Sequence, residues 1–105
     1  MVELIAFPEA NDPLASLEEL VDRVQALALK SENVFFNTPH VKVRMKERNV
    51  TIRQILDVLR HGKGIDGPTL DKYGDWRIKM KRYTAGRSVQ VVVVVKEYLE
   101  VVTVI

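Results

Sequence analysis

The sequence contains no cysteine among its 105 residues. This absence excludes a disulfide scaffold, a thiolate metal site and a cysteine nucleophile. Long apolar runs are also missing, because the longest, Val91–Val95, is far shorter than the roughly 18 residues that span a bilayer. No basic segment precedes an apolar stretch at the N-terminus, so we expect a cytoplasmic protein with no secretory signal and no membrane partner.

Aromatic residues are scarce at 7%, whereas 47% of the residues are hydrophobic and 29% are charged. This composition is typical of one globular domain. The formal net charge of +2 combines −5 over residues 1–39 with +7 over residues 40–105. We therefore expect one compact domain in which an acidic N-terminal extension, 1–39, precedes a basic part, 40–105.

Apolar residues at helical spacing predict three helices. The first is amphipathic and covers 13–30, the second runs from 39 to about 48, and the third covers 52–60. Between the first two, residues 34–36 form a short apolar stretch that fits a strand fragment or a loop anchor. Residues that favour helix ends flank these segments, namely Asp12, Thr38, Asn49, Thr51 and Gly62.

The C-terminal half has the patterns of strands. Glycine-rich residues 62–68 predict a loop, and from Trp76 apolar and basic residues alternate with a period of two. A turn at 84–87 leads to residues 88–96, whose five successive valines predict a central strand covered on both faces. Residues 99–105 form a last strand. The predicted fold is α+β, with N-terminal helices packed on one face of an antiparallel meander of three or more strands.

His40, Arg44 and Arg48 are the first candidate site. Their spacing places all three on one side of the second helix. An imidazole and two guanidinium groups can hold a phosphodiester and move a proton. The alternative is a solvated basic helix face whose charge is balanced by acids such as Glu47.

A second candidate is the basic face of the first strand of the meander. Strand alternation aligns Arg77, Lys79, Lys81 and Tyr83 on one surface, and Arg82 and Arg87 extend the charge around the turn. Such a surface suits RNA. The alternative is that these lysines protect a sheet edge or aid solubility.

Metal and cofactor sites are not expected. His61 lies at the predicted end of a helix, where it complements the helix dipole, and Asp57 lies four residues before it. One histidine–carboxylate pair is weak support for a metal site.

The stretch His40-Val-Lys-Val-Arg-Met-Lys-Glu-Arg-Asn-Val-Thr51 resembles a bacterial family of domains of unknown function. Its members read His-x-x-x-Arg-Met-x-x-Arg-Gly-Ile-Ser or Thr at this point. A helix ending near a glycine and a valine-rich hairpin then follow, and the resemblance covers about 40–105. Asn49 replaces the family's glycine, and asparagine also adopts the left-handed conformation.

That family is similar to the RelE and BrnT ribonuclease toxins of toxin–antitoxin pairs. The resemblance implies helices followed by a curved antiparallel sheet, metal-independent RNA cleavage by general acid–base chemistry, and a protein antitoxin as partner. His40 would be the general base or acid, and Arg44 or Arg48 would stabilise the phosphate charge. Lys79 and Lys81 would hold the RNA backbone.

Two other interpretations fit the same sequence. The basic part is also consistent with a non-catalytic module that binds nucleic acid or an acidic partner. The N-terminal helix must bury its apolar stripe. It would complete the core, inhibit the site in cis, or dock on a second protomer in a homodimer.

Overall fold

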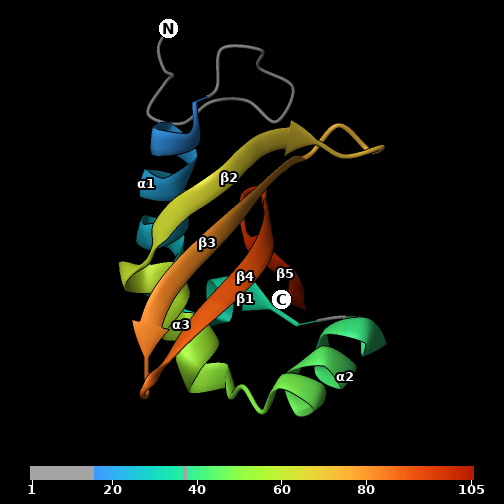
Figure 1. Cartoon of the computed structure of the whole chain (residues 1–105). Helices are drawn as coiled ribbons and strands as arrows, with labels where there is room; N and C mark the ends of the chain where they lie inside the picture. Colours follow the sequence, from blue (N-terminus) through green and yellow to red (C-terminus); the bar gives the residue numbers. More distant parts are fainter. Residues whose placement is uncertain (1–15, 37) are drawn as a thin grey trace, which may run out of the picture.

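The computed structural model describes residues 16–36 and 38–105. Helices lie against a five-stranded sheet with the strand order β1-β5-β4-β3-β2 (Figure 1). β1 runs parallel to β5, and the other neighbouring strands are antiparallel. The expected α+β fold is confirmed, and the parallel β1 makes the sheet mixed. No helix in these two described ranges is long and apolar enough to cross a membrane.

Helix α1 (Leu17–Ala28) is shorter than the sequence predicts. Ser16 has an extended backbone and acts as its N-cap, because its hydroxyl accepts a hydrogen bond from the Glu19 amide at 3.1 Å and the Glu19 carboxylate accepts one from the Ser16 amide. This capping box fixes the start of α1 at Leu17, and residues 13–15 of the predicted helix lie outside the described residues. The predicted cap Asp12 lies outside the described residues.

The next two helices, α2 (Pro39–Arg48) and α3 (Ile52–His61), follow the prediction closely. Thr38 caps α2 by accepting a hydrogen bond from the Val41 amide, and Thr51 forms a capping box with Gln54 at the start of α3. Between the helices, Asn49 is left-handed with φ of 54°. Local capping chemistry therefore sets these boundaries.

A short 3₁₀ helix, η1 (Ser31–Asn33), leads into the two-residue strand β1 (Val34–Phe35). β1 pairs with the first two residues of β5 (Leu99–Val104). The apolar stretch at 34–36 is thus a strand fragment, and the chain between α1 and α2 forms one edge of the sheet.

The segment predicted as a loop at 62–68 is instead largely strand β2 (Lys63–Leu70), so that prediction is wrong. β2 pairs with β3 (Trp76–Thr84) at the other edge of the sheet, and its register shifts on both sides of Asp66. An edge strand tolerates glycine, proline and bulges, because one side of its backbone has no ladder to maintain.

Strands β3 and β4 (Arg87–Val95) form the predicted hairpin, paired from Trp76↔Val95 to Thr84↔Arg87. The turn consists of Ala85 and Gly86, both with positive φ. A two-residue turn of this kind matches the twist of antiparallel strands and fixes their register.

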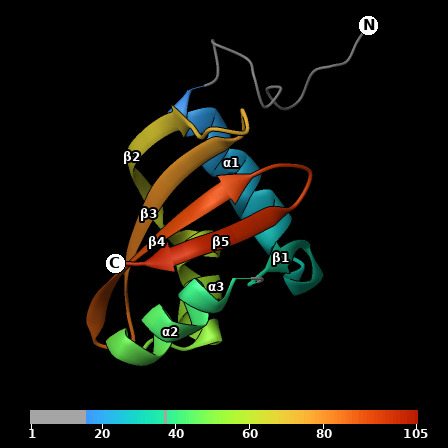
Figure 2. The same cartoon turned by 90° about the vertical axis from the view of Figure 1, so that its right-hand side faces the viewer.

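One face of this hairpin is the floor of the core. Ile78 and Met80 of β3 and the odd-numbered valines of β4 are buried there, under α1 and α3. α1 contributes Leu20, Val24 and Ala28 to the same hydrophobic cluster. Figure 2 shows α1 and α3 behind the strands, with α2 beside β5.

The opposite face of the hairpin differs from the expectation of a strand covered on both sides. Val92 is only half-buried, and it pairs with Lys79 on one side and Thr103 on the other. We call this surface, which carries Arg77, Lys79, Lys81, Val92, Val94 and Thr103, the open face. The expectation holds at Val94, which is 3% exposed, and is wrong at Val92, because polar side chains border it on this side.

We predict that Leu20→Ala lowers the free energy of unfolding of the whole domain by about 2–5 kcal/mol. Leu20 is 1% exposed and packs in the shared core, so its truncation leaves a cavity there. The matched control is Leu29→Ala, because Leu29 is 70% exposed. Urea unfolding followed by circular dichroism measures both variants. Equal stabilities of the two variants would show that α1 does not belong to the core.

Candidate nucleic-acid interface

Of the three candidate residues on α2, Arg44 is anchored to the fold, and His40 and Arg48 are not. Arg44 is half-buried, and its Nε donates to the Val104 carbonyl at 3.2 Å while its Nη1 donates to Glu47 Oε1 at 3.3 Å. His40 and Arg48 are exposed, and within the described residues they form no hydrogen bond or ion pair. Arg44 therefore holds α2 against β5, whereas His40 and Arg48 are available to a ligand.

The open face of β3 carries two uncommitted lysines. Lys79 and Lys81 are half-buried and make no ion pair with any described residue. Lys63 of β2, which the sequence did not single out, lies directly opposite Lys81 in the register. Like charges directly opposite each other in a sheet are destabilising, so an anion between them would relieve the repulsion.

Tyr83 continues this face toward the hairpin turn. It is 72% exposed, and its hydroxyl donates to the Gly86 carbonyl at 2.9 Å. The hydrogen bond fixes the hydroxyl end of the side chain and leaves the ring exposed. An exposed ring of this kind can stack on an unpaired base.

Arg82 and Arg87 have structural partners instead. Strand alternation directs Arg82 away from the open face, and its Nε donates to Asp57 Oδ2 on α3 at 3.1 Å. Arg87 Nη1 donates to the Asn49 carbonyl at the end of α2, at 3.2 Å. The structure thus separates Arg82 from Lys79 and Lys81. Because side chains alternate along a strand, residues 81 and 82 are expected on opposite faces.

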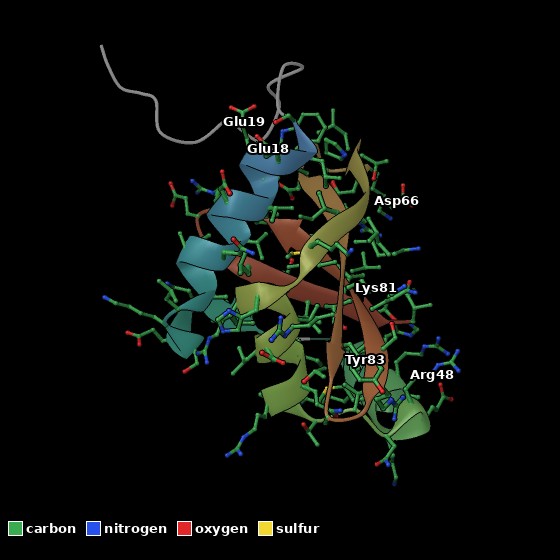
Figure 3. The ribbon with its side chains drawn as sticks, turned by 60° about the vertical axis from the view of Figure 1, so that its left-hand side comes forward. Glu18, Glu19, Arg48, Asp66, Lys81 and Tyr83 are labelled. Carbon is green, nitrogen blue, oxygen red and sulfur yellow. The ribbon has the colours of Figure 1, made fainter. Side chains whose placement is uncertain are left out.

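The contact between Arg87 and Asn49 brings the end of α2 to the β3–β4 hairpin. Arg48 precedes Asn49 and therefore lies near that hairpin. Figure 3 shows Arg48, Lys81 and Tyr83 on the side of the molecule away from α1. Glu18 and Glu19 lie at the start of α1, at the opposite end of the molecule from Arg48. Because Arg87 lies on the same side of β4 as the buried Val89, its contact with Asn49 places the end of α2 at the margin of the hairpin.

Two cavities lie along the open face, with Arg77 in the wall of both. The smaller has a volume of about 280 Å³ and is bordered by residues of β2, β3, β4 and the end of the chain. The larger, about 450 Å³, lies between the β2–β3 loop, β5 and Thr38, two residues before His40. Arg77 Nε is buried without a hydrogen-bond partner among the described residues. An unpaired buried donor of this kind is costly unless water or a ligand satisfies it.

The larger cavity has its charges neutralised internally. Burial opposes the charge of Lys96, but Glu100 and Asp75 outweigh it and raise the pKa of the ammonium group. Burial likewise opposes the charge of Asp71, yet amide donors from Asp75 and Tyr73 outweigh it and lower the pKa of that carboxyl. Little charge there is left for a ligand.

Among residues 16–36 and 38–105, no three histidine, aspartate or glutamate side chains gather where they could hold a metal ion. His61 and Asp57, the predicted histidine–carboxylate pair, both contact Arg82 instead. The Asp57 carboxylate accepts from Arg82, and the backbone carbonyl of His61 accepts from the same guanidinium.

The fold defines a small α+β domain with an extra parallel strand and a one-sided hairpin at its centre. Residues 37–105 match the model of the family described as domain of unknown function (DUF4258), and the chain belongs to this family. The expected membership of a family of domains of unknown function is confirmed over 37–105, whereas the motif from His40 to Thr51 and the similarity to RelE and BrnT stay predictions. No curated protein and no solved structure matches the chain significantly.

We predict that Asp57→Asn removes a pH-dependent part of the stability. A hydrogen bond from the Thr84 hydroxyl, reinforced by Arg82 against the opposing effect of burial, holds the pKa of Asp57 below its ordinary 3.8. The unfolded chain therefore binds the proton more readily, and the stabilisation present above pH 3.8 is lost as the pH falls through the lowered value. At neutral pH the free energy of unfolding of the wild type should exceed that of the variant by about 0.2–1 kcal/mol.

Urea unfolding at a series of pH values from roughly 7 to 2 measures this difference. We expect it to shrink toward the acid end of the series. A difference that stays constant with pH would contradict the assignment, and Thr84→Val should reproduce part of the effect.

Proposed function

We propose that this domain binds single-stranded RNA through the open face and the adjoining end of α2. The observation that carries the proposal is the contrast between its basic residues. Arg44, Arg82 and Arg87 are committed to carbonyls or carboxylates of the fold. On the open face Arg77 pairs with Asp71, but Lys79, Lys81 and the adjoining Lys63 are left without such partners in the described chain.

The chemistry of these groups supports a nucleic-acid ligand. Lysine ammonium groups attract phosphates without regard to sequence, and their spacing along paired strands suits a backbone that runs across the sheet. Tyr83 offers a ring for base stacking, and the adjoining cavities offer space for unpaired bases. A double helix would leave its bases stacked and unable to enter the cavities.

Replacing Lys79 and Lys81 together by glutamine should weaken RNA binding and flatten its salt dependence. Each lost phosphate contact reduces the slope of log affinity against log salt by about 0.7 for single strands. Fluorescence anisotropy of a labelled RNA oligonucleotide at several salt concentrations measures the slope. The matched control is Lys30→Gln, which removes one exposed lysine just beyond α1. If the control and the double variant behave alike, the open face is not the interface.

A second candidate function is metal-independent cleavage of that RNA, as in the RelE and BrnT toxins. The observation that favours it is His40, an exposed imidazole on the same helix as Arg48. Thr38, two positions before His40 in the chain, lines the larger cavity. An imidazole that is not held by another group can transfer the proton of a ribose 2′-hydroxyl. A protein antitoxin would then bind over the open face.

His40→Gln should abolish cleavage and leave RNA affinity within about twofold, because one proton carrier is worth roughly 10²–10⁴ in rate. His61→Gln is the matched control, since His61 is exposed at the end of α3, away from His40. Denaturing gels of an end-labelled RNA incubated with chelator follow the reaction. Intact RNA with wild-type protein would leave a non-catalytic binding module, and equal cleavage by His40→Gln would remove His40 from the mechanism.

A further inference from the structure

The smaller cavity on the open face has the size of a single-base site. Its volume of about 280 Å³ is just below the roughly 300–1,000 Å³ of small-molecule pockets. Val92, Thr69 and Thr103 belong to its lining, and the Thr103 hydroxyl donates to the Val104 carbonyl at 3.3 Å. A cavity of this size accommodates one base, not a stretch of oligonucleotide.

Asp66 and Lys79 both line this cavity, but they form no ion pair with each other. Asp66 of β2 is the register partner of Lys79 of β3, and both line the cavity. Within the described residues, however, the Asp66 carboxylate forms no ion pair or hydrogen bond. The carboxylates of the larger cavity are all engaged, as Asp71 is with two backbone amides. Asp66 therefore differs from them in being available to a ligand.

The local backbone explains why Asp66 and Lys79 stay apart. The β2–β3 register shifts immediately before and after Asp66, so this residue lies in an irregular segment of the edge strand. The following Gly67 has φ of 105°, and a Cβ there would lie 2.9 Å from the Arg77 carbonyl oxygen. Bulges of this kind redirect a side chain, and they occur next to functional sites.

We infer that this cavity binds one guanine base of the RNA, with Asp66 accepting hydrogen bonds from its Watson–Crick edge. The inference rests on the proposed RNA-binding function. A carboxylate only accepts hydrogen bonds, and guanine presents two adjacent donors, N1–H and the N2 amino group. Adenine presents a single amino donor beside the N1 acceptor, whose lone pair opposes the carboxylate. Lys79 also lines the cavity and would hold a flanking phosphate, whereas Arg77 forms an ion pair with Asp71 at 3.8 Å.

Two labelled heptamers test the inference, one of seven adenines and one with a single central guanine. We expect wild-type protein to bind the guanine heptamer roughly 5- to 100-fold more tightly. Asp66→Ala should make the two affinities equal. Asp22→Ala, which removes an exposed carboxylate on α1, should preserve the preference. The ratio of the two affinities is the readout, because any loss of negative charge strengthens RNA binding in general.

The outcomes separate the inference from the function on which it rests. Equal binding of both heptamers by wild type would overturn the guanine pocket and leave RNA binding standing. A guanine preference that survives Asp66→Ala would overturn the role of Asp66. Binding of neither heptamer would overturn the proposed function itself. Thermal unfolding of Asp66→Ala checks that the variant keeps its fold, which the exposure of Asp66 leads us to expect.

Discussion

The burial of one face of the β3–β4 hairpin beneath α1 and α3 determines the rest of this structure. Burial of apolar surface is the main favourable term in folding, and the odd-numbered valines of β4 provide the continuous surface here. Helices that pack on that face direct every second residue of β3 to the other side. The alternation that buries Ile78 and Met80 therefore also presents Lys79 and Lys81 together.

The same constraint divides the basic residues into two groups. Arginines that reach the helices or the sheet margin are used to hold elements together, as Arg44 holds α2 to β5 and Arg82 holds β3 to α3. Lysines on the open face form no ion pair with any described residue, and Lys63 lies opposite Lys81, which is destabilising. A surface that retains such a cost is better explained by a ligand than by stability.

The sequence predicts the elements whose signals are local. Thr38, Asn49 and Thr51 cap or end helices through neighbouring backbone groups, and the alternation from Trp76 defines β3. β2 was missed because its glycines and proline are signals of a loop, and only pairing with β3 makes it a strand. Asp66 and Lys63 were missed with it. The anchoring of Arg44 was also hidden, since its partner carbonyl lies 60 residues away in the chain.

The most direct test of the account is an NMR titration of the ¹⁵N-labelled chain with a short single-stranded RNA. Binding at the open face predicts that the amide shifts change most at Lys79, Lys81, Val92 and Thr103, with smaller changes toward Arg48. Amides of α1 on the other side of the sheet should keep their positions. Shift changes concentrated on α1 and α3, or none at millimolar RNA, would contradict the assignment of the open face as the binding surface.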